Sequence, residues 1–126
     1  MDELSGLYNR RYLNAVLSER KFTKCKSLYG IMMDVNAFKY INDNFGHSMG
    51  DKAICTLGNI LFRSIPAAGM AIRYAGDEFI VLLSGVEEES VLATMKEIHN
   101  NLSRFNESGI EPFTLSVSMG YDRIWI

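Results

Sequence analysis

The sequence predicts a mixed α/β protein of the α+β type, in which helices pack on a mainly antiparallel sheet. Three observations lead to this fold class. The chain has 126 residues, a common length for one compact domain, and 48% of them are hydrophobic, enough to fill one core. Apolar residues recur at helical spacing in some segments and form short strand-length runs in others. Only two prolines punctuate the chain, and we find no repeat or low-complexity tract.

Along the first half of the chain, the pattern predicts a helix, a strand and a second helix. The first helix is expected over Arg10 to Glu19, which carries apolar residues on one face. A nearly continuous apolar run from Ser27 to Val35 includes the acid Asp34 near its end and is interpreted as a central buried strand. After a polar stretch from Asn42 to Gly50, apolar residues at spacings of three and four predict a helix that ends at Pro66.

The second half of the chain predicts a hairpin, a helix and a closing strand. Two short strands, Met70 to Tyr74 and Phe79 to Leu83, face each other across Ala75 to Glu78, whose Gly-Asp pair favours a hairpin. Helical spacing returns from Glu87 to Phe105, and Phe113 to Met119 alternates as a strand. The order, a helix followed by βαββαβ, is that of a ferredoxin-like core, in which the first strand lies beside the central hairpin.

Charge and cysteine content narrow the classes of function. Thirteen Lys and Arg against 15 Asp and Glu give a net charge of −2, so no basic field is available for nucleic acid or an anionic membrane. The apolar runs are far shorter than the roughly 20 residues of a membrane span, and we expect no membrane contact. Cys25 and Cys55 form no C-x-x-C pair and are typical of reduced thiols, which predicts a cytoplasmic location.

Three acids are expected to meet at one end of the predicted sheet. If the first strand neighbours the hairpin, Asp34 comes close to Asp77 and Glu78. Like charges at such range repel unless a proton or a cation neutralises them, so the cluster predicts Mg²⁺ or Mn²⁺. Each acid also has a purely structural interpretation: Asp34 could cap the next helix, and Gly76 with Asp77 could serve only the turn. The many polar residues from position 34 to 51 favour a site.

Four segments carry a resemblance to a known family. Residues 2–11 read DELSGLYNRR, residues 34–51 read DVNAFKYINDNFGHSMGD, residues 73–79 read RYAGDEF, and residues 118–120 read SMG. In this order and at this spacing, over nearly the whole chain, the sequence resembles the GGDEF domains of bacterial diguanylate cyclases. The resemblance implies a palm-like fold of the kind found in nucleotide cyclases and polymerases.

The resemblance also implies an activity and a set of residues that carry it. Two GTP molecules would be condensed into cyclic di-GMP with release of pyrophosphate. Asp34, the backbone carbonyl of Val35 and Asp77 would hold the metal ion, with Glu78 as a further ligand. Asp77 would in addition accept a proton, and Lys39 would stabilise the transition state.

A substrate-binding set is implied in the same way. The step that joins the first strand to the next helix, at Ala37, Phe38 and Lys39, would direct backbone N–H groups at phosphate oxygens. By the resemblance, Asn42 and Asp51 correspond to the pair that reads guanine. An amide and a carboxylate match the guanine edge, and adenine would leave them unpaired. The loop carrying Asp51 would be shaped by Asp43, Gly46, His47 and Gly50.

The sequence departs from the family pattern at three places. Ala75 replaces the first glycine of the hairpin motif, and the replacement causes little backbone strain if the turn needs no positive φ. Asn36 replaces a frequent second acid. Family members continue past S-x-G into a last helix whose basic side chains hold phosphates, whereas this sequence stops at Ile126. The single domain expected over residues 1–126 would lack that helix and bind GTP more weakly.

Three functions therefore stay open. An active cyclase would work as a homodimer, because each half-site presents one nucleotide, and a sensory or regulatory domain would lie upstream or downstream in the full-length protein. A catalytically weak or inactive GTP-binding regulatory domain is favoured by Ala75 and by the missing helix. A ferredoxin-like RNA-binding or scaffold module would need exposed aromatic and basic residues on the sheet.

Overall fold

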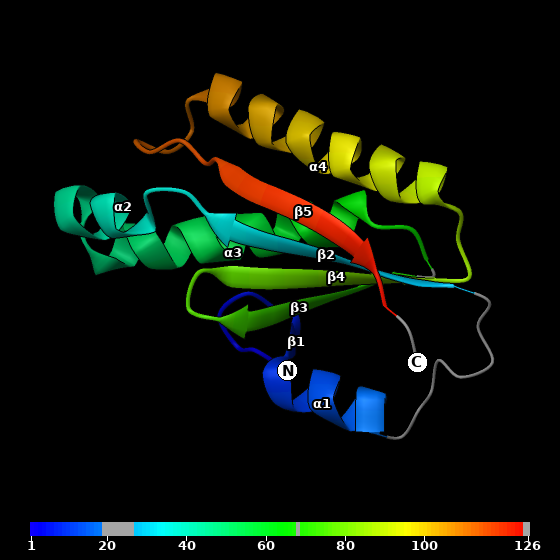
Figure 1. Ribbon diagram of the computed structural model, residues 1–126. Helices are drawn as coiled ribbons and strands as arrows, with labels where there is room; N and C mark the ends of the chain where they lie inside the picture. Colours follow the sequence, from blue (N-terminus) through cyan, green and yellow to red (C-terminus); the bar gives the residue numbers. More distant parts are fainter. Residues whose placement is uncertain (19–26, 68, 125–126) are drawn as a thin grey trace.

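A five-stranded sheet forms the centre of the protein (Figure 1). The computed structural model describes residues 1–18, 27–67 and 69–124. The strands are β1 (Tyr8–Asn9), β2 (Leu28–Val35), β3 (Gly69–Ala75), β4 (Glu78–Ser84) and β5 (Val117–Arg123). The helices are α1 (Arg10–Ser18), α2 (Phe38–Phe45), α3 (His47–Ser64) and α4 (Glu88–Ser108).

The strand order is β1-β3-β4-β2-β5. β2 pairs antiparallel with both β4 and β5, and β3 pairs antiparallel with β4. The predicted ferredoxin-like core is therefore confirmed, with its first strand beside the hairpin. β1 was not predicted, because a strand of two residues is too short to show an alternating pattern; it pairs parallel with β3 at the sheet edge.

The two faces of the sheet are covered to different extents. Ile31, Met33 and Val35 of β2 point into the main core, which α3 and α4 close from one side. On the opposite face α1 packs alone in the described part of the chain, and its Leu13 joins a small cluster with Leu28 of β2 and residues of β3 and β4 (Figure 1). None of the helices within the described residues has the length and hydrophobicity needed to cross a membrane.

The predicted bounds of the closing strand were wrong. It was expected over Phe113 to Met119, but the strand is Val117–Arg123. Phe113 and Leu115 are buried in an irregular segment, which produces the same alternation as a strand. Asn106 takes the place of a neighbouring strand there: its side chain accepts from the Leu115 N–H at 2.7 Å and donates to the Leu115 carbonyl at 2.8 Å.

The polar stretch from Asn42 to Gly50, predicted to be a loop, is largely helical. α2 and α3 are joined at Gly46, which has a φ of 90°. Glycine adopts this angle readily, whereas other residues adopt it only with strain. α3 already begins at His47, so Asp51 lies on a helix. Polar residues occupy the outer faces of this helical pair, which hid its helical period from the sequence pattern.

Two expectations fall outside the described residues. The helix predicted to reach Glu19 is described from Arg10 to Ser18, where it agrees with the prediction. Cys25 also lies outside the described ranges, and Cys55 is a free, half-buried cysteine.

Candidate functional site

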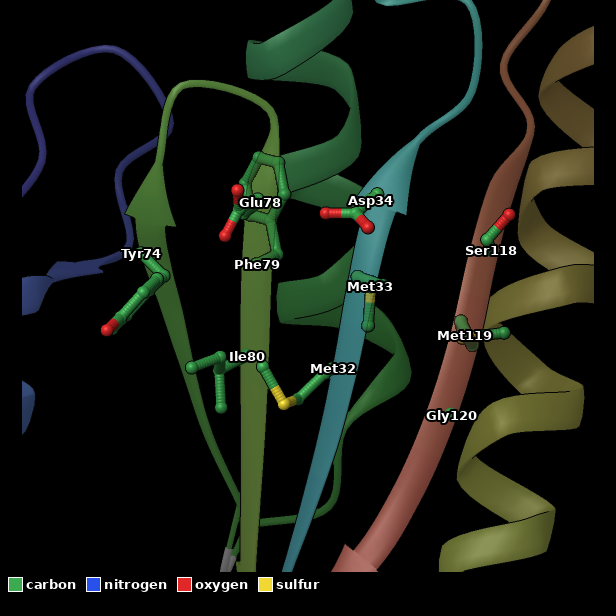
Figure 2. Close-up of a pocket in the computed structure, with 10 residues that line it drawn as sticks. All are labelled: Met32, Met33, Asp34, Tyr74, Glu78, Phe79, Ile80, Ser118, Met119 and Gly120. Atoms are coloured by element: carbon green, nitrogen blue, oxygen red, sulfur yellow. The ribbon is translucent and has the colours of Figure 1, made fainter.

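Two acids and a serine form one row across three strands. Asp34 of β2 is the register partner of Glu78 on β4 and of Ser118 on β5. All three line a hollow of about 380 Å³ on the sheet face opposite α3 and α4. Figure 2 shows Asp34 and Glu78 on neighbouring strands, with Met32 and Ile80 in the next apolar row.

The carboxylates of this row have no counter-charge among the described residues. Within residues 1–18, 27–67 and 69–124, neither Asp34 nor Glu78 has a side-chain hydrogen bond or an ion pair. Asp34 does not cap α2, because the N-cap position is Ala37 and no side chain caps it. The structural interpretation of Asp34 as a helix cap is therefore wrong, and its carboxylate is available to a ligand.

Asp77 contacts the end of β2 through its backbone. It lies in the turn between β3 and β4, and its carbonyl accepts from the Val35 N–H at 3.0 Å. No three Asp, Glu, His or Cys side chains in the described part of the chain are grouped closely enough to hold a metal ion. The predicted convergence of three carboxylates is corrected to two, because position 77 belongs to the turn and only Asp34 and Glu78 line the hollow.

The donor set nevertheless fits a hard divalent cation. Mg²⁺ is commonly held by one or two carboxylates and completes its octahedral shell with water and substrate phosphates. Asp34 and Glu78 supply two carboxylates beside an open hollow, and Ser118 adds an oxygen in the same row. Carboxylate oxygens suit Mn²⁺ equally.

Asn36, which replaces an acid of the family pattern, anchors the neighbouring serines. Its amide donates to Ser116 Oγ at 2.9 Å and accepts from Ser118 Oγ at 2.8 Å. Asn36 therefore links Ser118, in the row that contains Asp34, to Ser116 by two side-chain hydrogen bonds. The sequence motif included Ser118 without indicating this role.

The turn between β2 and α2 places three predicted substrate-binding residues directly after Asp34. Ala37 has φ 55° and ψ 32°, a left-handed conformation that L residues adopt at a cost. Phe38 is half-buried and packs against the main core, which fixes the start of α2. Lys39 is exposed in the first turn of the helix.

The two predicted guanine-reading residues lie on adjacent helices. Asn42 is half-buried on α2, and Asp51 is exposed on α3. In the described ranges, neither side chain has a protein hydrogen-bond partner. They do not line the hollow beside Asp34, but α2 and the start of α3 lie at the same end of the sheet as the β3–β4 turn (Figure 1).

The β3–β4 turn is held by Arg73, the first residue of the hairpin motif, whose role the sequence left open. Arg73 donates to the Gly76 carbonyl through Nε and Nη2, at 3.1 and 2.9 Å, and forms an ion pair with Asp2. Partial burial would raise the pKa of the Asp2 carboxyl, but hydrogen bonds from Ser5 and the charge of Arg73 outweigh it and leave the pKa below its ordinary value. Ala75 holds its place without a positive φ.

Comparison with known sequences identifies relatives along the whole chain. The family model described as "Diguanylate cyclase, GGDEF domain" matches residues 1–124. The sequence is 32% identical over 123 residues to the probable diguanylate cyclase DgcC of Escherichia coli strain K12, which covers 94% of this chain and 33% of that protein. The chain thus spans about a third of the length of this curated relative.

Solved structures show the same fold. The diguanylate cyclase SiaD of Pseudomonas aeruginosa, crystallised with its activator SiaC, aligns with a TM-score of 0.87 and 25% identity over 99% of this chain and 50% of that chain. The GGDEF domain of DgcB from Caulobacter crescentus, in complex with c-di-GMP, aligns with a TM-score of 0.84 and 25% identity over 99% of this chain and 77% of that chain.

Proposed function

The chain belongs to the GGDEF domain family, and we propose that it is a diguanylate cyclase domain that joins two GTP molecules into cyclic di-GMP. The 3′-hydroxyl of each nucleotide attacks the α-phosphorus of the other, and each attack breaks the bond to the β-phosphate. Two phosphodiester bonds form, two pyrophosphates leave, and each hydroxyl gives up one proton.

The observation that carries this proposal is the pair of Asp34 and Glu78 on neighbouring strands, without protein counter-charges in the described residues. These carboxylates, with the Val35 carbonyl, are proposed to hold Mg²⁺ or Mn²⁺. When bound, the ion supplies positive charge that offsets the triphosphate and favours ionisation of the attacking hydroxyl. Asp77, in the adjoining turn, is proposed to contribute a further ligand or to accept the proton.

The β2–α2 turn is proposed to bind the triphosphate. Its backbone at Ala37, Phe38 and Lys39 begins a helix, and helix N-termini favour anions because their N–H groups lack intrahelical partners. The Lys39 ammonium adds a charge that can follow the phosphate as it develops negative charge in the transition state. Asn42 and Asp51 are proposed to read the guanine edge through their amide and carboxylate, which have no protein hydrogen-bond partner among the described residues.

A homodimer is proposed as the active assembly. The proposed site has one pair of carboxylates for the metal ion and one pair of side chains for guanine, whereas the product contains two guanosines. A second copy facing the first would supply the second nucleotide. We further propose that the domain works in the cytoplasm. We also propose that a sensory or regulatory domain controls it, since the chain spans only about a third of its relative DgcC.

A GTP-binding domain without turnover is the second candidate, favoured by the replacement of a family glycine at position 75. The backbone argues against a large effect of this replacement, because Ala75 is exposed and adopts no positive φ. The added methyl group therefore needs no strained turn. Cyclase activity is the better supported of the two functions.

The test is to incubate the protein with GTP and Mg²⁺ and to measure cyclic di-GMP by chromatography. We expect product from the unmodified chain, and loss of product in Asp34→Asn and Glu78→Gln. Glu107→Gln is the matched control, because Glu107 is exposed on α4 and lies outside the site. GTP binding without any product would instead support the regulatory function.

A further inference from the structure

The side chain of Asn42 occupies the space that a side chain at Gly50 would need. Gly50 lies in the first turn of α3, is buried, and has ordinary helical geometry rather than a positive φ. A Cβ built at this position would overlap the Oδ1 atom of Asn42 and lie 2.8 Å from its Cγ. The expectation that Gly50 shapes a loop is thus corrected: glycine is needed there for space.

We infer that Gly50 is a positioning residue for base recognition, because it lets the Asn42 amide lie against α3 beside Asp51. The inference rests on the proposed function, in which Asn42 and Asp51 read guanine. Asp51 directly follows Gly50 in the sequence, so the surface against which the amide rests belongs to the same helical turn as the carboxylate. The absence of a side chain at position 50 thereby sets how far the Asn42 amide lies from the Asp51 carboxylate.

The connection between the two helices leaves little room for another solution. Only Gly46 separates α2 from α3, and its N–H donates to the Asn42 carbonyl at 2.9 Å. Ile41 of α2 is buried in the main core, so α2 cannot move away from α3 without exposing it. A methyl group at position 50 would therefore displace the end of the Asn42 side chain, which is the flexible partner, rather than separate the helices.

The displaced amide would lose its role in selectivity. In the described part of the chain the Asn42 side chain makes no protein hydrogen bond; its Oδ1 faces Gly50, and its Nδ2 donor, which lies farther from Gly50, is the group that can donate to guanine O6. Guanine presents an acceptor at O6 and donors at N1 and the 2-amino group, and adenine presents a different pattern. A rotated amide would leave part of the guanine edge unpaired, and the preference of the site for GTP over ATP would therefore be smaller.

A double-mutant cycle tests the inference. Binding of GTP and of ATP, each as the 3′-deoxy nucleotide that lacks the attacking hydroxyl and so cannot turn over, is measured by calorimetry with Mg²⁺ present for the unmodified chain, Gly50→Ala, Asn42→Ala and the double variant. We expect Gly50→Ala to weaken GTP binding by about tenfold and to reduce the preference for GTP over ATP. In the Asn42→Ala background the same substitution should have little further effect, because the displaced group is already gone.

Thermal unfolding of the same four proteins tests the contact without nucleotide. Alanine is a better helix former than glycine, so Gly50→Ala should raise the unfolding midpoint more in the Asn42→Ala background than in the unmodified chain. Ser48→Ala, an exposed change in the same helical turn, serves as the control and should alter neither GTP affinity nor selectivity.

The outcomes separate the inference from the function on which it rests. Equal loss of GTP affinity from Gly50→Ala in both backgrounds, or unchanged selectivity in Gly50→Ala, would overturn the positioning role. Equal shifts of the unfolding midpoint in both backgrounds would refute the contact itself. An unmodified chain that binds GTP no better than ATP would overturn the proposed guanine recognition, while the unfolding cycle still reports on the contact.

Discussion

The Arg73 guanidinium lies 3.3 Å from the Asp2 carboxylate and links the N-terminal residues to the turn between β3 and β4. The same guanidinium donates twice to the Gly76 carbonyl within that turn. Asp2 in turn accepts from the Ser5 N–H and hydroxyl at 2.8 and 2.7 Å. The turn that carries Asp77 is therefore fixed to the start of the chain through one side chain.

Removal of Arg73 is expected to cost more stability than removal of the Asp2 charge. The two side chains are 20% and 22% exposed, so Asp2→Asn should lower the free energy of unfolding by roughly 0.5–1 kcal/mol. Arg73→Ala should lower it by roughly 1–2 kcal/mol, because two hydrogen bonds to Gly76 are also lost. Urea denaturation measures both. Equal losses of unfolding free energy would contradict the assigned contacts. Arg104→Ala is the control, because Arg104 and Glu97 form an exposed pair 4.0 Å apart.

The Asp2 interaction also predicts a dependence of stability on pH. The pKa of Asp2 is lowered in the folded protein, so the unfolded chain binds this proton more readily. The stabilisation is present above the unfolded pKa of about 3.9 and is lost as the pH falls through the folded pKa. We expect the difference in unfolding free energy between the unmodified chain and Asp2→Asn to be constant above about pH 5 and to shrink as the pH falls from about 5 to 2. A constant difference across this range would refute the shift.

Two substitutions to glycine should have opposite effects on stability. Ala37 has a φ of 55°, so Ala37→Gly relieves left-handed strain and should stabilise the fold by up to about 1 kcal/mol. Ala75 has no positive φ, so Ala75→Gly should destabilise the fold by roughly 0.5–1 kcal/mol through the greater freedom of the unfolded chain. Chemical denaturation of the pair provides the comparison, and shifts of the same sign would contradict the backbone geometry.

Asp77→Ala should abolish metal-dependent formation of cyclic di-GMP while leaving the fold intact. The contact of this residue with Val35 runs through the backbone carbonyl, which alanine retains. Circular dichroism melting should change little, whereas product formation from GTP and Mg²⁺ should disappear. Retained turnover would remove the Asp77 side chain from the proposed mechanism.

Much of the fold could be predicted from local patterns. The apolar run that became β2, the hairpin around residues 75–78 and the long helix α4 each have a strong period or turn signal. The predicted element bounds were wrong where an interaction outside the local pattern determined the backbone conformation. Asn106 satisfies the backbone of Leu115, so an alternating segment is not a strand, and Gly46 lets a polar stretch form two helices.

The sequence by itself determined the fold class, the family and the residue types available for a metal ion and a guanine base, because these depend on the order and spacing of side chains along the chain. Only the tertiary structure decided which of them meet. Strand pairing sets Asp34 opposite Glu78 and Ser118 and brings Asp77 into the turn beside them, while helix packing brings Asn42 against Gly50. Such contacts join residues far apart along the chain or on separate helices, and their distances follow from packing that local sequence does not encode.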